Sequence, residues 1–384
     1  MSPSYDILII GGGIQGAGCA QAAAAAGYSV AVLEKFERPG LGTSCKSSKL
    51  IHGGLRYLET AQVKLVYECL HERKLLLQNA PHLVALKPFY IPVYKNSIRK
   101  PWLIWCGLIL YALLSGKRFK IIPKNRWDEL DGLNTKDLLM VFQYLDGQTD
   151  DQRLTESVMQ SAQQLGAEFI SDAELISAEC EPDLCNAFYK QGDERKQLTA
   201  RVVINAAGPW ANLVLQKITP KSPLADMDLV LGTHIIIPGS LQQGMYYMEA
   251  PQDQRAVFVL SWHEGIMIGT TETEYQASPD QVVPPESDIE YLIEVYNHYF
   301  KNSISRSDVK RAFAGLRVLP TGGDAFSRSR DIMIHNDVAN PQVFTVYGGK
   351  LTAYRATGER VLKCVKQLLP KRQQQVDVKC LRLP

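Results

Sequence analysis

The hydrophobic residues near the start of the chain fall into two short continuous runs separated by a glycine-rich turn. Residues 7–10 are all apolar, residues 11–16 read Gly-Gly-Gly-Ile-Gln-Gly, and a second run at residues 28–33, apolar except for Ser29, ends at Glu34. Continuous apolar runs of this length indicate buried strands, and the stretch between them has the length of a helix. The pattern therefore predicts a strand, a tight turn, a helix and a second strand that closes with an acidic residue.

Elsewhere the pattern predicts a mixture of helices and strands without an internal repeat. Helices are expected at residues 62–79, 154–164, 287–300 and from the Gly348-Gly349-Lys350 block to about residue 369. Strands are expected at residues 168–170, 202–205 and 343–347. Short strand-like runs at residues 234–237, 256–260 and 265–269 predict a mainly antiparallel sheet. The chain thus combines a strand–helix–strand opening with a separate antiparallel region.

The glycines of the opening unit have the spacing that a phosphate-bearing dinucleotide requires. Gly11 allows the tight turn, Gly13 removes a side chain that would block the pyrophosphate, and Gly16 lets the helix pack close to the strand. Glu34 follows Gly13 by 21 residues, where a carboxylate can bind the ribose hydroxyls. An acidic residue there favours adenosine without a 2′-phosphate.

Composition and charge exclude some classes of function. A chain of 384 residues exceeds what one hydrophobic core usually supports, so two domains are expected. The 42 basic and 40 acidic residues give a net charge of +2, which argues against a nucleic-acid-binding protein. The eight cysteines show no CxxC pairs and no Cys/His spacing typical of a metal site. We therefore expect reduced thiols and no metal.

Residues 87–127 form a basic segment with an apolar centre. This segment contains nine Lys or Arg residues and no Asp or Glu, and residues 102–114 are apolar or small. The apolar run is shorter than the about 20 residues that span a bilayer, but its Trp and Tyr residues and basic flanks favour an interfacial position on anionic lipids. A buried core helix is the alternative. Because no secretory signal precedes the first strand, we expect a peripheral position on the cytoplasmic face of the inner membrane.

Several sequence blocks are typical of one family. The loop after Glu34 continues at residues 42–59 as Gly-Thr-Ser-Cys-Lys-Ser-Ser-Lys-Leu-Ile-His-Gly-Gly-Leu-Arg-Tyr-Leu-Glu. Further blocks lie at residues 144–148, 205–210, 269–271, 315–317 and 348–355. In this order they resemble the FAD-dependent, membrane-associated glycerol-3-phosphate dehydrogenases, and they cover nearly the whole chain. The His-Gly-Gly-Leu-Arg-Tyr and Gly-Gly-Lys-Leu-Thr blocks are the most specific.

The resemblance implies a fold class, a cofactor and partners. It implies an α/β protein with a glutathione-reductase-type FAD-binding Rossmann domain, interleaved with a mainly antiparallel β-sheet substrate domain in a D-amino-acid-oxidase-like architecture. The FAD-binding domain would comprise residues 1–85, 141–220 and 328–384, and the substrate and membrane-facing domain residues 86–140 and 221–327. FAD would be bound non-covalently and a membrane quinone would accept the electrons. A homodimer is left open.

The resemblance also assigns roles to individual residues. Cofactor contacts are expected from Gly11, Gly13, Gly16, Glu34, Thr43, Ser44, Ser47, Ser48, Lys49, His52, Ala206, Ala207, Gly208, Gly349, Lys350, Leu351 and Thr352. Substrate contacts are expected from Arg56, Tyr57, Thr270 and Arg330, and catalysis from His234, Arg317 and Lys350. His234 is the leading candidate for the base that takes the hydroxyl proton, while His52 orients the flavin loop or serves as a weaker candidate. Arg317 and Lys350 would stabilise the developing alkoxide.

The chain departs from the family pattern at three places. It ends at Pro384, where the family usually continues with a helical C-terminal domain. Cys45 and Lys46 stand where small or other polar residues are usual, and Val318 replaces a proline after Arg317. Residues 320–329, next to Arg330, form a shortened segment.

Three functional hypotheses follow. The primary one is an enzyme that oxidises sn-glycerol 3-phosphate to dihydroxyacetone phosphate by hydride transfer to FAD and passes the electrons to a membrane quinone. A set of several cations favours such a phosphorylated polyol, because one or two arginines suffice for a carboxylate. The first alternative is an FAD-dependent dehydrogenase or oxidase of an amino acid or 2-hydroxy acid. The second is a non-catalytic flavin-binding protein of the membrane surface.

Overall fold

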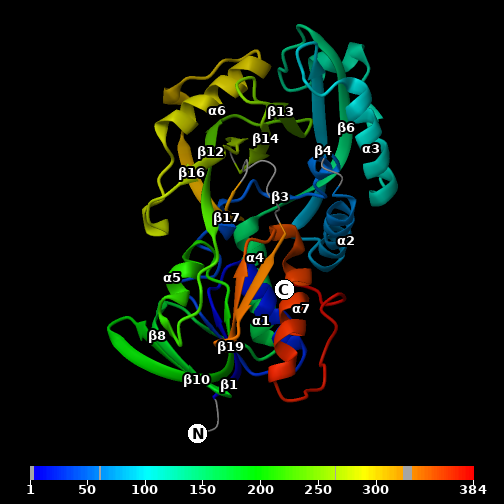
Figure 1. Cartoon of the computed structure of the whole chain (residues 1–384). Coiled ribbons are helices and arrows are strands. Elements are labelled where there is room, and N and C mark those ends of the chain that lie inside the picture. Colours follow the sequence, from blue (N-terminus) through cyan, green and yellow to red (C-terminus); the bar gives the residue numbers. More distant parts are fainter. Residues whose placement is uncertain (1–3, 60–61, 264, 323–330) are drawn as a thin grey trace.

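The computed structural model describes residues 4–59, 62–263, 265–322 and 331–384. These residues form two β-sheets that lie one above the other in Figure 1, each with its own helices. Both ends of the chain lie with the lower sheet. The two sheets are connected several times by the chain, because strands of the upper sheet alternate in sequence with elements of the lower one.

The first sheet contains nine strands, with β1 between β2 and β10 and all three parallel. Its strands are β1 (Tyr5–Ile10), β2 (Val30–Leu33), β7 (Glu168–Ile170), β8 (Ala173–Glu181), β9 (Leu184–Gln191), β10 (Glu194–Asn205), β11 (Ile218–Thr219), β18 (Met333–Asp337) and β19 (Asn340–Tyr347). Parallel pairing extends to β7 on one side and to β19 on the other. The carboxyl ends of β1, β2, β10 and β19 therefore meet at one edge of the sheet.

The second sheet contains ten strands and is mainly antiparallel. Its strands are β3 (Leu50–Ile51), β4 (Val84–Tyr94), β5 (Lys120–Ile121), β6 (Leu138–Thr149), β12 (Met227–Pro238), β13 (Met245–Glu249), β14 (Ala256–Trp262), β15 (Gly265–Gly269), β16 (Thr273–Tyr275) and β17 (Arg311–Pro320). Only the β4–β13 pair is parallel among the pairs described for this sheet. The division into two interleaved domains stays a prediction. Its boundaries place β3 and most of β6, residues 141–149, in the first domain, although both strands pair in this second sheet.

Helices bury the apolar faces of both sheets. They are α1 (Ile14–Ala25), α2 (Val63–Asn79), α3 (Pro101–Ser115), α4 (Asp151–Gln164), α5 (Ala211–Leu215), α6 (Glu286–Tyr299) and α7 (Tyr354–Val365). In β1, Ile7 and Ile9 pack with α1, α4 and α7, while Leu8 and Ile10 pack on the opposite face, as the two-residue period of a strand requires. Helix α6 packs on the second sheet over β12, β14 and β15, and α2 and α3 pack together beside β4 and β6.

Most predicted elements are confirmed, but the long strands β4, β6 and β17 and the hairpin of β8 and β9 have no counterpart among the predicted strands. The opening strand, helix and strand correspond to β1, α1 and β2, and the expected antiparallel region corresponds to β12, β14 and β15. The hairpin of β8 and β9 was not predicted, although its residues alternate between buried and exposed as in a half-buried strand. Cys180 and Cys185 face each other across it as a disulfide, so the expectation of reduced thiols is wrong for this pair.

The apolar run in the basic segment forms helix α3 at the outer edge of the upper half of the molecule (Figure 1). Only Leu108 and Tyr111 of this helix are buried, whereas Trp102, Trp105 and Leu113 are 67%, 46% and 76% exposed. At 100° per residue the exposed side chains fall on one face and the buried ones on the opposite face. The alternative of a buried core helix is therefore wrong, and α3 presents an apolar face to its surroundings.

Candidate active site

A cavity of about 950 Å³ is lined by residues from both sheets. It extends from the carboxyl ends of β1 and β2, past the loop that follows β2, to β12, β17 and the residues after β19. A volume of this size lies at the upper end of the range for small-molecule and cofactor sites. Of the residues predicted for cofactor, substrate or catalysis that the structure describes, all but Gly16 and Lys49 line this cavity.

The dinucleotide end of the cavity is built around the turn between β1 and α1. Gly11 has φ +103°, and a side chain there would meet the Ala206 carbonyl oxygen at 2.7 Å. A Cβ on Gly13 would have only the Ser44 hydroxyl nearby, at 3.2 Å. The open space beside Gly13, at the N-terminus of α1, is where a pyrophosphate would be bound by backbone amides.

Glu34 is held rigidly at the end of β2. Its side chain is buried, and its two oxygens accept hydrogen bonds from the backbone amides of Gly12 at 2.6 Å and Phe36 at 3.0 Å. Burial raises the pKa of this carboxyl, while the two backbone amides act in the opposite direction. Glu34 thus lines the cavity from a fixed position suited to the ribose hydroxyls of a dinucleotide.

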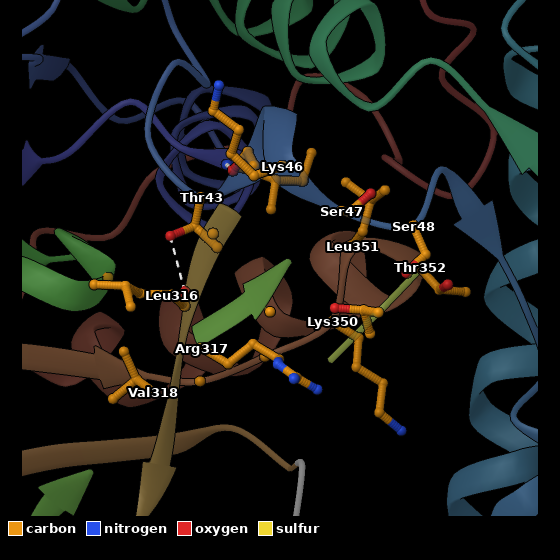
Figure 2. Close-up of a pocket in the computed structure, with 18 of the residues that line it drawn as sticks. Thr43, Lys46, Ser47, Ser48, Leu316, Arg317, Val318, Lys350, Leu351 and Thr352 are labelled. Carbon is orange, nitrogen blue, oxygen red and sulfur yellow. Dashed lines mark hydrogen bonds between the residues drawn. The ribbon is translucent and has the colours of Figure 1, made fainter. Parts of the chain in front are cut away.

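The loop after β2 packs against β17 and carries the predicted flavin contacts (Figure 2). The Thr43 hydroxyl donates to the Leu316 carbonyl oxygen at 2.9 Å, and the Ser44 hydroxyl accepts from the Ile14 amide at 2.9 Å. These bonds connect the loop to the second sheet and to the start of α1. The loop therefore closes one wall of the cavity across both sheets.

Gly16 and Lys49 lie away from the cavity and have structural contacts. A Cβ on Gly16 would meet the Gly11 carbonyl oxygen at 1.9 Å, so this glycine permits close packing of α1 on β1. The Lys49 ammonium is buried and donates to Asp151 of α4 at 2.7 and 2.8 Å. Lys49 therefore anchors the flavin loop to α4 and is not among the cavity-lining residues. Arg330 lies outside the described residues.

His234 of β12 is a buried side chain on the wall of the cavity. Its Nε2 atom lies 3.0 Å from the Ser48 hydroxyl, its ring stacks on Phe313, and its Nδ1 atom is buried without a hydrogen-bond partner among the described residues. Burial, followed by the nearby Lys49 and Arg317 cations, lowers the pKa of His234 to about 3. The imidazole is therefore neutral at pH 7 and able to accept a proton.

Arg317 of β17 extends into the cavity (Figure 2). Two neighbours fix its guanidinium. Nη1 donates to Glu272 at 2.7 Å, and Nη2 donates to the Thr271 carbonyl oxygen at 3.0 Å. Glu272 and Arg255 also line the cavity and were not predicted. Glu272 follows directly after the Gly269-Thr270-Thr271 block, so its position in the sequence could have indicated it.

Lys350 follows β19 and extends toward the same open region as Arg317 (Figure 2). Its ammonium lies 4.0 Å from the centre of the Tyr57 ring and donates to the Cys69 sulfur at 3.6 Å. Gln15 of α1, a cavity residue without a predicted role, donates to the Lys350 carbonyl oxygen at 3.2 Å. The loop after β19 is thereby tied to the start of α1.

A dinucleotide turn, a buried carboxylate placed for a ribose and two cations at the far end lie in a single cavity, and together they define a flavin oxidoreductase. The described residues fit FAD, because Gly13 leaves open space at the helix N-terminus and Glu34 is fixed where a ribose would lie. The described residues contain no group of three or more His, Cys, Asp or Glu side chains that could hold a metal ion.

The chain belongs to the FAD dependent oxidoreductase family, which matches residues 6–360. It is 36% identical over 368 residues to the aerobic glycerol-3-phosphate dehydrogenase of Escherichia coli K12, covering 93% of this chain and 72% of that one. It is 34% identical over 376 residues to the D-erythritol 1-phosphate dehydrogenase of Brucella abortus, covering 95% and 74%. The family, the FAD cofactor and the oxidoreductase class are thus confirmed.

A solved structure agrees with this assignment. The glycerol-3-phosphate dehydrogenase of Bacillus halodurans complexed with FAD superposes with a TM-score of 0.79 at 25% identity. The match covers 99% of this chain and 67% of that one. The predicted fold class, an FAD-binding domain of this type combined with an antiparallel sheet, is confirmed.

Proposed function

We propose that this oxidoreductase converts sn-glycerol 3-phosphate to dihydroxyacetone phosphate and that the electrons pass to a membrane quinone. One observation carries the proposal. Two cationic side chains, Arg317 and Lys350, line the same cavity as the neutral, buried His234. A phosphate dianion requires cations, and an arginine fork can bind two of its oxygens. The names of the relatives support the same substrate class.

Each group has a distinct task in the proposed reaction. Arg317 and Lys350 bind the phosphate and stabilise negative charge on the substrate oxygen, and the cavity-lining Arg56, Tyr57 and Thr270 complete the substrate site. His234 takes the proton of the substrate hydroxyl, oriented by Ser48. When bound, FAD supplies the acceptor for the hydride.

The proposal is tested by adding sn-glycerol 3-phosphate to the purified FAD-loaded protein without oxygen. We expect the flavin absorbance near about 450 nm to bleach and to return when a soluble quinone analogue is added. Glycerol, which lacks the phosphate, is the matched control and should leave the spectrum unchanged. An unchanged spectrum with sn-glycerol 3-phosphate, in protein that retains FAD, would contradict the proposal.

A longer phosphorylated polyol is a second candidate substrate. The relative from Brucella abortus that carries the name D-erythritol 1-phosphate dehydrogenase is 34% identical and matches 95% of this chain. The same bleaching experiment with D-erythritol 1-phosphate separates the two substrates by their kcat/KM values. Bleaching by an amino acid or a 2-hydroxy acid alone would instead favour a carboxylate substrate.

The proposed location is the surface of an anionic membrane. Among the described residues, no helix has both the length and the apolar character needed to cross a membrane. Helix α3 has 15 residues and rises about 22 Å, less than a bilayer core of about 30 Å. Its exposed apolar face, with the exposed Lys100, Lys117 and Arg118 at its ends, supports a position in the lipid interface.

The basic segment contributes fewer cations to such a surface than its sequence suggested. Arg99 donates to Glu59 and Glu249, Lys95 pairs with Asp137, and Arg126 pairs with Glu129. The exposed Lys87, Lys120 and Lys124 remain alongside the three cations at the ends of α3. Lipid binding through this segment therefore depends on apolar contact as well as on charge.

Replacing both Trp105 and Leu113 with aspartate should weaken binding to vesicles that contain phosphatidylglycerol by at least about tenfold, because two apolar contacts are replaced by anions. Cosedimentation with such vesicles measures the effect. Val338→Asp is the matched control, because Val338 is 96% exposed in the turn between β18 and β19. Equal partitioning of the double variant and this control would contradict the proposed surface.

The apolar lining of part of the cavity also supports the proposal that the electron acceptor is lipid-soluble. Five of the cavity's lining residues are large aliphatic side chains from α3 and the turn at residues 55–58, namely Leu55, Leu58, Leu103, Ile104 and Leu110. Helix α3 therefore contributes both an outer apolar face and one wall of the cavity. An apolar ring could reach the cavity along this wall from the surface on which α3 would rest.

A further inference from the structure

Tyr111 is a buried tyrosine on the inner face of the surface helix α3. Its side chain is 2% exposed, although most of the helix around it is at the surface. The hydroxyl donates to Asp146 at 3.0 Å and accepts from Arg73 at 3.1 Å and from the Gly53 backbone amide at 3.0 Å. A hydroxyl has one proton and two lone pairs, so these three bonds use its full capacity.

The partners of this hydroxyl are themselves buried and charged. Arg73 donates to Asp146 at 2.6 Å, and both side chains are almost fully buried. Asp146 of β6 also accepts from the Gly147 amide at 3.1 Å and lines the cavity. Tyr111 is therefore the contact through which α3 joins an ion pair between α2 and β6.

The Gly53 amide belongs to the loop that carries the predicted substrate contacts. A Cβ on Gly53 would meet the Tyr111 hydroxyl oxygen at 2.4 Å, so the loop backbone lies directly against this side chain. Arg56 and Tyr57 follow within the single helical turn at Leu55–Leu58, and both line the cavity. The Tyr57 ring in turn contacts the Lys350 ammonium.

We propose that Tyr111 is a positioning residue whose hydroxyl holds the loop of residues 52–57 in its substrate-binding conformation, so that α3 is linked to the catalytic cavity. The inference rests on the proposed function, since it assigns Arg56 and Tyr57 to the substrate. Among the described residues, the Gly53 amide donates no other hydrogen bond. The Tyr111 hydroxyl therefore fixes the loop backbone where it turns toward the cavity. Neither the hydride nor the proton passes through Tyr111.

Tyr111→Phe removes only the hydroxyl and keeps the ring that packs on Tyr144. We expect KM for sn-glycerol 3-phosphate to rise about tenfold and kcat to change less than about twofold, because the loop binds substrate and contributes no group to the chemical step. Tyr246→Phe is the matched control, since it also removes a buried tyrosine–carboxylate bond in the second sheet, here to Asp131 at 2.7 Å. The control should leave KM unchanged.

A combined variant separates positioning from general destabilisation. In a background with both Arg56→Ala and Tyr57→Ala, Tyr111→Phe should raise KM by less than about twofold, because the side chains that the loop positions are already absent. A full tenfold effect in that background, or equal KM changes in Tyr111→Phe and Tyr246→Phe, would overturn the inference. Bleaching of the wild-type flavin by sn-glycerol 3-phosphate is measured first. A failure of the proposed function is thereby distinguished from a failure of the inference about Tyr111.

Hydrogen exchange provides a measurement that needs no variant. In the FAD-loaded wild-type protein the Gly53 amide should exchange at least about a hundredfold more slowly than freely exposed amides, already before substrate is added, because its partner is a buried hydroxyl. Exchange of this amide at the rate of exposed loop amides would overturn the inference even if Tyr111→Phe fails to accumulate as folded protein.

Discussion

Arg317→Ala should lower kcat/KM for sn-glycerol 3-phosphate by about a thousandfold. In the proposed reaction the guanidinium makes two charge-assisted hydrogen bonds to the substrate, and each contributes about 1.5–3 kcal/mol. Because Glu272 and the Thr271 carbonyl fix the guanidinium beforehand, little ordering is required on binding. Steady-state kinetics with a quinone analogue, together with the anaerobic bleaching rate, measure the loss.

Two further variants test whether this loss comes from substrate binding. Arg317→Lys keeps the charge but not the planar fork, so it should recover only part of the activity. Arg311→Ala is the matched control, because Arg311 is an exposed residue on the same strand, β17, and does not line the cavity. A decrease of less than about threefold in Arg317→Ala would contradict the assigned role.

The dinucleotide end of the site could be predicted from the sequence because its geometry is local. Gly11, Gly13 and Glu34 lie within one strand–helix–strand unit, and their spacing alone fixes the turn, the space for a phosphate and the end of the second strand. The predicted elements of this unit agree with β1, α1 and β2. Local spacing therefore predicted the dinucleotide-binding unit, and the short strand-like runs predicted the antiparallel sheet. The family resemblance implied the fold class that combines them.

The contacts that fix the catalytic end could not be predicted, because they join residues distant in the sequence. Ser48 and His234 meet only through the position of the flavin loop against β12, and Glu272 reaches Arg317 only through the pairing of β12 with its neighbours. Lys49 is the opposite case. It belongs to the loop that was predicted to contact the flavin, but its side chain pairs with Asp151 of α4 and does not line the cavity.

Helix α3 shows a different limit of sequence analysis. Its composition predicted an apolar segment between basic flanks, but an almost wholly apolar helix has no polar face that marks the outer side. The structure resolves this by placing Tyr111 and Leu108 inward and Trp102 and Leu113 outward. The buried network around Tyr111 explains this orientation, because the hydroxyl must meet Asp146 and Gly53.

His234→Gln should reduce the rate constant for flavin reduction by about a thousandfold while the protein retains FAD. The proposed base contributes about 10²–10⁴ in rate, and glutamine cannot take the proton of the substrate hydroxyl. His298→Gln is the matched control, because His298 lies exposed on α6 and should leave the rate unchanged. Ser48→Ala, which removes the partner of Nε2, should reduce the rate by about tenfold through loss of orientation.

The pH dependence gives an independent test of the same base. The folded pKa of His234, about 3, lies below the ordinary histidine value of 6.5, so the neutral, proton-accepting form persists to lower pH than in a free imidazole. With saturating substrate, the wild-type rate should stay level from about pH 8 to about pH 6 and fall only at lower pH, whereas an unperturbed histidine would lose half its activity near about pH 6.5. His234→Gln should lack that low-pH fall in its residual rate. Loss of half the wild-type activity near about pH 6.5 would contradict the lowered pKa of His234, whereas an unchanged rate in His234→Gln would exclude His234 as the base.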